Sequence, residues 1–280
     1  MVDSWMINLL LFSDKRRDFL LLLKDEPRNI DEMLDELKVP RNSILPQIKK
    51  LKEKGLIERE GDECRLTILG NIIVRKLHPL VDAALVLDID DSFWVSRKLD
   101  SLPGCFLERV GELKGCCLVE PEPGNEFDLI PEIVSAFRDP SRAMMLFSYF
   151  HPLLPSFFLD VAKKGIEFPI VLTSGVFERF LQDFRNEGEE ILTQENVDIF
   201  VLEENALETP SVIAVSDSTL IFGLLNRWER ADRQYLVNCN QNAVKWGEEL
   251  FAHYKERARK VTSLEEPEAY DPISSESAQK

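Results

Sequence analysis

The stretch that decides the fold of the first part of the chain is RNSILPQIKKLKEKGLIEREGDECRLTILG, residues 41–70. A proline in a helix interior costs about 3 kcal/mol, but the first turn tolerates it because the backbone N–H groups there have no helical partner. Pro46 therefore predicts a helix that begins at Asn42 or Ser43, both of which are favourable capping residues. Gly55 ends this helix, and the residues after it read as strand, tight turn and strand. The stretch predicts a helix followed by a β-hairpin.

Two further helices are expected before this stretch. Ser13 can cap a helix over residues 14–24, in which Leu20 and Leu23 mark the inner side, and Pro27 follows its end. Asn29 can cap the next helix, in which apolar residues recur at the spacing of one buried helix face. The order helix, helix, turn, helix and hairpin is typical of a winged helix-turn-helix. We therefore predict an α+β winged helix-turn-helix domain over residues 1–75.

The charge of the chain is unevenly distributed. The formal net charge is −16, yet residues 1–75 carry 14 basic and 14 acidic residues, so the excess of acid lies in residues 76–280. Such an acidic body repels a polyanion, and a nucleic-acid contact therefore needs a local cationic element. Residues 41–54 supply one, with five basic residues and one acid.

A cationic helix of this kind can enter the major groove of DNA, where polar side chains reach base edges and lysines contact phosphates. We predict contacts to double-stranded DNA from the outward side of this helix and from the base of the hairpin. These residues are Arg41, Asn42, Ser43, Gln47, Lys50, Arg59 and Arg65. Two alternatives stay open: residues 41–54 form an ordinary solvated helix face, or the winged helix is a protein-interaction module that binds no DNA.

A long apolar segment follows the hairpin. Thr67 can cap a helix over residues 68–88, and Pro79 should kink this helix near Arg75. We interpret residues 76–90 as a linker or dimer helix, because regulators usually read two half-sites with two copies of the reading domain. A homodimer is therefore expected, and burial of the same apolar residues within one subunit is the alternative.

Residues 91–260 alternate between short apolar runs and amphipathic stretches, which predicts an α/β domain with a mixed sheet. We expect this domain to sense a small-molecule effector, and we expect Trp94, Trp228 and Trp246 to lie in its core. Residues 261–280 are polar and acidic and contain proline and serine, so a disordered tail is expected there.

Polar side chains lie where two of the predicted strands of this domain end. Tyr149 and His151 mark the end of the strand expected at residues 144–150, and Thr173 and Ser174 mark the end of the next strand. Ligands of open α/β sheets bind at the carboxyl ends of strands, so we predict that these four residues line one effector pocket. Ordinary strand-end and helix-cap chemistry is the alternative.

Motifs for catalysis and for cofactors are missing from the sequence. The chain has no GxGxxG, GxxxxGK[ST] or GxSxG motif, and none of its three histidines has a metal-ligand partner three or four residues on. His253-Tyr254-Lys255 resembles half of the HxK signature of phospholipase D-type enzymes, but a second copy is missing and Lys260 stands where aspartate is needed. We expect no enzyme, no cofactor and no metal site, with a phospholipase D-like phosphodiesterase as the alternative.

Cysteine usage and hydropathy indicate the cellular compartment of the protein. Five cysteines without CxxC spacing favour a reducing cytoplasm, and no run of 18 apolar residues is present that could span a membrane. We expect a cytoplasmic protein without a membrane partner. The adjacent Cys116 and Cys117 could report redox state, and burial of small side chains on a strand is the alternative.

Several longer motifs occur together in residues 5–260. The first part contains SDKRRDFLLLLKDEPRNIDEMLDELKVP, ILPQIKKLKEKGLIE and RLTILG, and the second contains SFWVSRKLDSLPGCFLERVGEL, FSYFHPLLPSF, IVLTSGVFERF and KWGEELFAHYKERA. With these motifs the chain resembles the archaeal winged helix-turn-helix transcriptional regulators, found mainly in methanogens, that carry a C-terminal methanogenesis-regulatory domain. The resemblance implies that the outward face of residues 41–54 reads DNA and that the sensor domain is similar to a degenerate phospholipase D fold. Arg97 departs from the family pattern, in which a histidine is expected after the Phe-Trp pair.

Overall fold

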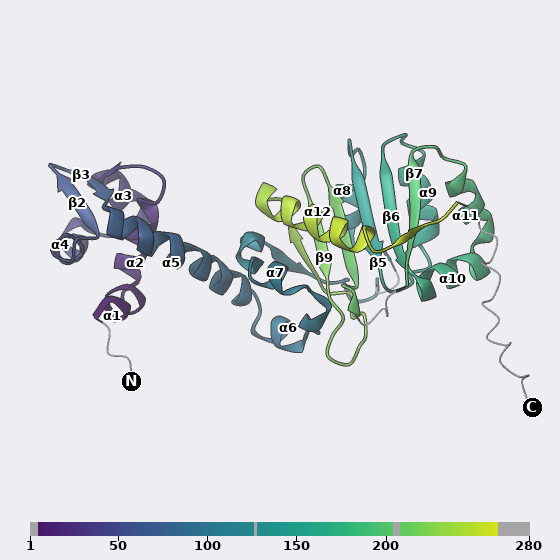
Figure 1. Cartoon of the computed structure of the whole chain (residues 1–280), viewed down its shortest axis with the longest axis horizontal. Helices are drawn as coiled ribbons and strands as arrows, with labels where there is room; N and C mark the ends of the chain where they lie inside the picture. The colour runs from purple at the N-terminus through teal and green to yellow at the C-terminus, as the bar shows by residue number, and fades with distance from the viewer. Residues whose placement is uncertain (1–4, 126–127, 204–207, 263–280) are drawn as a thin grey trace, which may run out of the picture. The chain divides into compact units, whose positions relative to one another are not determined.

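The computed structural model describes residues 5–125, 128–203 and 208–262. The chain divides into two compact units, the first ending at Ala84 and the second beginning at Leu85 (Figure 1). Each unit has a hydrophobic core of its own. Among the described residues, no helix has the length and apolar character that crossing a bilayer requires.

The N-terminal unit combines helices with a small antiparallel sheet, as expected for an α+β region. Its helices are α1 (Trp5–Leu11), α2 (Asp14–Leu22), α3 (Ile30–Leu37), α4 (Arg41–Glu53) and the start of α5 (Ile68–Leu87). Its strands are β1 (Arg28–Asn29), β2 (Ile57–Glu60) and β3 (Glu63–Leu66), in the sheet order β1-β3-β2. The predicted hairpin is therefore present, with Glu60 opposite Glu63 at its turn.

Helix α4 begins earlier than the sequence predicted. Pro40 occupies the capping position in place of Asn42 or Ser43, and the Ser43 hydroxyl donates to the Pro40 carbonyl at 2.8 Å. Pro46 is thus the sixth residue of the helix and not a member of its first turn. It offers no N–H to the Asn42 carbonyl. The helix tolerates this loss because Pro46 and Asn42 are both exposed, so water can bind that carbonyl.

The core of the N-terminal unit follows the predicted helical periodicity. Ile44, Ile48 and Leu51 of α4 are almost completely buried. Asn29 caps α3 as expected, because its side-chain oxygen accepts from the backbone N–H of Asp31 at 2.8 Å. The core thereby fixes which side of α4 faces solvent.

Helix α1 was not predicted as an element of the fold. Its Leu9 and Leu10 are buried in the core of the N-terminal unit. The Arg16 Nε donates to the Leu9 carbonyl at 2.6 Å and so ties α1 to α2. Ser13 precedes α2, as predicted, but its side chain makes no capping hydrogen bond.

Helix α5 is continuous and contains Pro79. It approaches the residues before β2 so closely at Gly70 that a side-chain methyl there would overlap the backbone carbonyl of Leu56. Val74 and Leu77 are buried, but much of the predicted apolar face is not. The large apolar residues exposed near the start of α5 are Ile68, Leu69 and Ile72.

The C-terminal unit is an α/β domain with an eight-stranded mixed sheet, as predicted. The sheet order is β11-β7-β6-β5-β8-β9-β10-β4. Its strands are β4 (Cys117–Val119), β5 (Ala143–Phe147), β6 (Phe168–Thr173), β7 (Val197–Leu202), β8 (Val212–Ser216), β9 (Leu220–Gly223), β10 (Tyr235–Asn238) and β11 (Arg259–Lys260). Strands β5, β6 and β7 are parallel, and the remaining pairs are antiparallel.

Helices cover both faces of this sheet (Figure 1). They are α6 (Asp91–Ser96), α7 (Gly104–Leu107), α8 (Pro131–Ala136), α9 (Leu154–Ala162), α10 (Ser174–Asp183), α11 (Arg185–Leu192) and α12 (Gln241–Lys255). Helix α12 crosses one face, where Trp246 packs edge-on against Phe222 with ring centroids 5.2 Å apart. Residues of α8 to α11 share a core with alternate residues of the strands, such as Met145 and Phe147, on the other face.

The tryptophans do not all lie in the core. Trp94 and Trp246 are buried, as predicted. Trp228 is 62% exposed, so its prediction was wrong. It lies in the loop between β9 and β10, where the Arg227 guanidinium is 4.5 Å from its ring centroid. An exposed aromatic ring with a stacked cation needs no burial, and hydropathy alone does not show this.

The described fold extends slightly beyond the predicted boundary at residue 260. Val261, expected in the tail, is buried, and its N–H donates to the Ile199 carbonyl at 2.8 Å. Residues 263–280, where we expected most of the disordered tail, lie outside the described residues.

Candidate nucleic-acid interface

Helix α4 turns one face to the core and the opposite face to solvent. Ile44, Ile48 and Leu51 face the core, whereas Asn42 and Lys49, two helical turns apart, are exposed. Other residues of α4 outside the core include Ser43, Pro46, Lys50, Lys52 and Glu53. The exposed side is therefore polar and mainly cationic.

The lysines of α4 are accessible. The side chain of Lys49 is 78% exposed, and its Nζ lies 3.9 Å from the nearest oxygen of Glu53, at the limit of an ion pair. Lys50 and Lys52 are exposed, and neither has an acidic partner within 4.0 Å in the part of the chain that the structure describes. The Lys50 and Lys52 ammonium groups can therefore meet an incoming anion without first leaving a carboxylate, and the Lys49 ammonium has only a long contact to give up.

The two arginines expected beside α4 are held by acids. Arg41 donates to Asp31 and, at 2.8 Å, to Asp62. Asp62 also accepts from Arg59 at 3.1 Å, and the Arg59 Nε donates to the Gly61 carbonyl at 2.7 Å. The side chains of Arg41 and Asp62 are 42% and 48% exposed. A phosphate can reach this cluster, but it has to compete with the Asp62 carboxylate.

Two other predicted contact residues are also engaged. Arg65 donates to Glu58, directly opposite in the hairpin, at 2.8 Å. This hydrogen bond raises the pKa of Arg65 above its ordinary value, and the positive charge is balanced locally. The Gln47 Oε1 accepts from Arg16 of α2 at 3.2 Å. Gln47 is therefore half-buried between two helices and less free to reach a base edge than the sequence implied.

A hollow of about 540 Å³ lies between α4 and the hairpin turn. It is lined by Leu45, Ile48, Lys49, Lys52, Arg59 and Gly61. The structure thus gathers three cations, of which the sequence reasoning named only Arg59. Lys49 lies two helical turns after the predicted contact residue Asn42, and this spacing could have found it.

The residues expected to form an effector pocket have structural partners. The Tyr149 hydroxyl lies 2.6 Å from the Tyr235 hydroxyl, and burial raises the pKa of Tyr149 well above its ordinary value. His151 is buried, and its Nδ1 accepts from the backbone N–H of Leu153 at 3.2 Å.

Thr173 and Ser174 are not brought together with those two residues. Leu172 shares the core cluster to which Tyr149 packs, and side chains alternate along a strand, so Thr173 points to the other face of the sheet. Ser174 lines a hollow with Phe177 and Glu178 that contains none of the other three predicted residues. The geometry therefore does not favour one pocket made by all four.

The half HxK motif lies in α12 and is packed against aromatic rings. His253 has its ring centroid 6.0 Å from that of Phe106, and the Lys255 ammonium is 4.9 Å from the Phe200 centroid. Among the described residues, no group of three or more histidine, cysteine, aspartate or glutamate side chains is arranged to hold a metal ion.

The adjacent cysteines differ in environment. Cys116 is buried, and burial raises the pKa of its thiol to about 12. Cys117 is exposed. The Cys116 thiol stays protonated at neutral pH, which favours packing over redox chemistry for this residue.

Comparison with known proteins finds two consecutive domains of one family. The N-terminal domain of methanogenesis regulatory protein FilR1 matches residues 6–85, and the middle domain of the same protein matches residues 127–257. The methanogenesis regulatory protein FilR1 of Methanothrix harundinacea (strain 6Ac) is 24% identical over 257 residues, which are 89% of this chain and 56% of that protein. The chain thus spans little more than half the length of this relative.

Two further proteins are similar to the chain. An uncharacterized HTH-type transcriptional regulator of Pyrococcus furiosus is 35% identical over 112 residues, which are 38% of this chain and 67% of that protein. The solved structure of TrmBL2, described as an archaeal chromatin protein with a novel mode of DNA binding, covers 92% of this chain and all of its own at 14% identity, with a TM-score of 0.41. That score is too low to support an argument. Both sequence relatives are named as regulators, as the sequence predicted, and the chain belongs to the FilR1 family of methanogenesis regulatory proteins.

Proposed function

We propose that this regulator binds double-stranded DNA through an N-terminal winged helix-turn-helix. In this proposal α3 and α4 form the helix-turn-helix, α4 enters the major groove, and the β2–β3 hairpin is the wing. The observation that carries the proposal is the exposed cationic side of α4, where Lys49, Lys50 and Lys52 are available to phosphates. The acidic remainder of the chain makes such a local cationic surface necessary for DNA binding.

The predicted contact residues fall into three groups in this proposal. Asn42 and Lys50 are exposed on α4 and are placed to reach the duplex directly. Arg41 and Arg59 lie beside α4, where the Asp62 carboxylate competes with phosphates for both guanidinium groups. The remaining three, Ser43, Gln47 and Arg65, make hydrogen bonds within the protein, and we assign them to positioning of the reading surface.

Salt-dependent binding of a duplex tests the proposal. The full chain selects duplexes from genomic fragments, and fluorescence anisotropy then follows their affinity as a function of salt. Lys50→Ala should weaken binding and reduce the slope of log affinity against log salt by about 0.9, because each phosphate contact releases counterions. Lys76→Ala, which removes an exposed lysine of α5, is the matched control. Unchanged affinity and slope for both Lys50→Ala and Gln47→Ala would overturn the assignment of α4.

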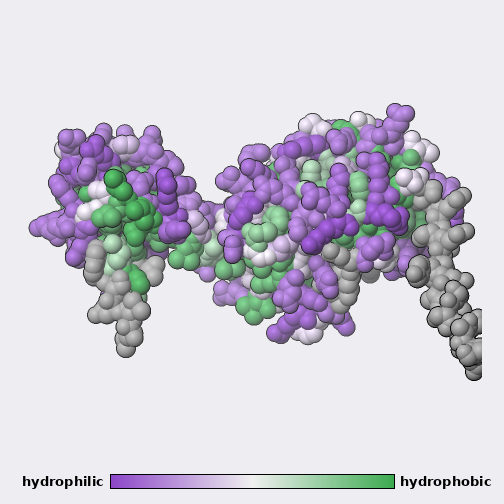
Figure 2. All heavy atoms as spheres, in the orientation of Figure 1, coloured by the Kyte–Doolittle hydropathy of each residue, from purple (hydrophilic) through white to green (hydrophobic). Residues whose placement is uncertain are grey.

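We propose in addition that two copies associate through the start of α5. Ile68, Leu69 and Ile72 are 82%, 56% and 56% exposed, and Figure 2 shows apolar side chains gathered over this part of the N-terminal unit. Ile68 and Ile72 lie one helical turn apart, so a second copy of the same helix can cover them. Two copies would also supply two reading heads for two half-sites.

Light scattering tests the homodimer. Ile72→Glu should convert the dimer to a monomer, because it places a charge in the apolar contact. Val95→Glu, which changes an equally apolar residue that is 76% exposed in the other unit, should leave the dimer intact. A wild-type chain that is monomeric at micromolar concentration would contradict the proposal.

We also propose that the α/β unit senses a small-molecule effector and that the chain acts in the cytoplasm, where its DNA would lie. We propose further, from the family resemblance, that its sheet is similar to a degenerate phospholipase D fold. The half HxK motif in α12, whose His253 and Lys255 pack against aromatic rings, is compatible with the loss of catalysis in such a fold. Phosphodiester turnover that disappears with His151→Ala would favour the enzyme alternative. A protein partner bound with little salt dependence would favour the interaction-module alternative.

A further inference from the structure

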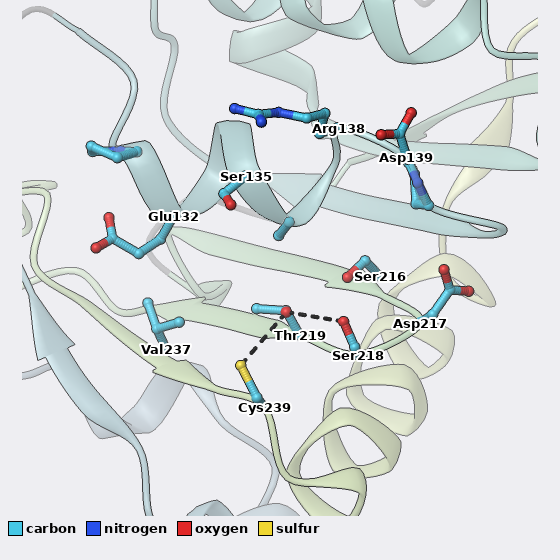
Figure 3. A pocket seen from close by; sticks show the side chains of 13 residues that line it. Glu132, Ser135, Arg138, Asp139, Ser216, Asp217, Ser218, Thr219, Val237 and Cys239 are labelled. Carbon is cyan, nitrogen blue, oxygen red and sulfur yellow. Dashed lines mark hydrogen bonds between the residues drawn. The ribbon is translucent and has the colours of Figure 1, made fainter.

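A hollow of about 600 Å³ with a mixed polar and apolar lining lies at one end of strands β8, β9 and β10 of the α/β unit. It forms where α8 and the residues after it face the turn between β8 and β9 and the end of β10 (Figure 3). Its polar lining includes Glu132, Arg138, Ser216, Asp217, Thr219 and Cys239. The volume falls within the range of about 300–1,000 Å³ that is typical of small-molecule sites.

Two polar groups of this hollow are buried without a partner. Ser216 is 1% exposed, and its hydroxyl, which faces the hollow in Figure 3, makes no hydrogen bond among the described residues. One carboxylate oxygen of Glu132, in the first turn of α8, is also buried and unbonded. A buried polar group without a hydrogen bond costs about 1–3 kcal/mol. Both groups would gain a partner from a ligand that donates hydrogen bonds.

The charge of the residues that line the hollow indicates which kind of hydrogen-bond donor a ligand should carry. Glu132, Asp139 and Asp217 are acidic, whereas Arg138 is the one basic residue found in the lining among the described residues. Burial alone would raise the pKa of Asp217, but hydrogen bonds from Ser141 hold it below its ordinary value, so this carboxylate stays ionised. Hydrogen bonds that involve an ionised group are about twice as strong as those between neutral groups, and a cationic donor adds charge attraction to the carboxylates.

We propose that this hollow binds a small organic cation whose N–H groups donate to Glu132 and Ser216. An organic ammonium or amidinium group fits better than a metal ion, because the acids of the lining are not clustered as metal ligands among the described residues. The Ser216, Ser218 and Thr219 hydroxyls add hydrogen-bond acceptors along the opposite wall. The role of this ligand as the effector depends on the proposed function, whereas its binding does not.

The Cys239 thiol supplies a local reporter for the test. Cys239 is exposed and lines the hollow, while Cys105 and Cys117 are exposed elsewhere and serve as internal controls. Iodoacetamide alkylation of the full chain is followed for each peptide by mass spectrometry. The probes are 1,4-diaminobutane and agmatine, and 1,4-butanediol is the uncharged counterpart of the diamine. We expect at least one amine to slow alkylation of Cys239 by about threefold or more without slowing the other two thiols, at probe concentrations up to about 10 mM.

Matched variants separate a specific site from general attraction to an acidic protein. Glu132→Gln should weaken the amine effect by about tenfold, because it removes the charge but keeps the shape of the side chain. Glu195→Gln removes an exposed carboxylate outside the hollow and should leave the effect within about twofold. Slow alkylation of the buried Cys116 reports whether the Glu132→Gln chain is folded.

Several outcomes would overturn the proposal. They are the absence of protection by either amine, equal protection by 1,4-butanediol, or protection that survives Glu132→Gln. A separate measurement addresses regulation: the protecting amine should change the duplex affinity of the wild-type chain but not that of Glu132→Gln. Thiol protection without an effect on DNA would retain the site and remove its role as effector, and a failure of DNA binding would leave the thiol result unaffected.

Discussion

Replacing Asp62 by asparagine should strengthen DNA binding. The Asp62 carboxylate accepts from Arg41 at 2.8 Å and from Arg59 at 3.1 Å, so both guanidinium groups are engaged before a phosphate arrives. Partly exposed ion pairs of this kind are each worth about 0.2–1 kcal/mol. Without these two ion pairs, a phosphate no longer has to displace the Asp62 carboxylate, which lowers the free energy of binding by roughly 1 kcal/mol. This corresponds to about a fivefold gain in affinity for DNA.

The salt dependence distinguishes this mechanism from the general effect of removing one negative charge. Arg41 keeps its partner Asp31, whereas Asp62 is the one acidic partner of Arg59 found among the described residues. We therefore expect one additional phosphate contact, made by Arg59. The slope of log affinity against log salt should steepen by about 0.9, as measured by fluorescence anisotropy between about 50 and 200 mM salt.

Two controls make this prediction refutable. Asp25→Asn removes an exposed carboxylate from the turn after α2, in the same unit, and so reproduces the charge change alone. The double variant Arg59→Ala/Asp62→Asn should lose the steeper slope, because the released guanidinium is gone. Equal gains from Asp25→Asn and Asp62→Asn, or a slope that does not change in Asp62→Asn, would refute the reasoning.

Three further predictions concern stability and reactivity. Gly70→Ala should lower the free energy of unfolding of the N-terminal unit by about 3 kcal/mol, because the added methyl overlaps the backbone carbonyl of Leu56. Thermal denaturation measures this, and an unchanged midpoint would speak against the close approach. Asp232→Ala should lower the free energy of unfolding by about 3–5 kcal/mol, because it leaves the Arg97 guanidinium, whose side chain is 0% exposed, without its acidic partner. Denaturant titration measures this, and wild-type stability would contradict it. Iodoacetamide should modify the exposed Cys117 much faster than the buried Cys116 at neutral pH, and the rate at Cys116 should rise only as the pH approaches its pKa of about 12. Peptide mass spectrometry measures both rates, and equal rates would contradict the burial of Cys116.

The elements of the N-terminal unit could be predicted because their signals are local. Helical spacing placed Ile44 and Ile48 of α4 in the core, and Gly55 adopts the left-handed φ of 68° that its place after the helix predicts. The start of α4 was missed because Pro40 acts as the cap through its carbonyl, which accepts from Ser43. Capping statistics describe side chains and gave no weight to this arrangement.

The alternation of elements in the second unit predicted a mixed sheet but not its order. Strand β5 pairs with β6 in parallel and with β8 in the antiparallel sense, although all three are short apolar runs. The hollow proposed as a cation site was missed for the same reason. Glu132, Ser216 and Cys239 come from three distant segments, and only the folded sheet with helix α8 packed on it brings them to one hollow.

The amino-acid sequence alone determined that a cationic helix and a hairpin would form in a chain whose remainder is acidic, since hydropathy spacing and residue charge are local properties. The tertiary structure decided which cations are free to bind. Asp31 of α3 and Asp62 of the hairpin turn hold Arg41, whereas Lys50 has no acidic partner within 4.0 Å in the described part of the chain. The charge that a ligand meets depends on distances between segments, and these distances exist only once the chain has folded.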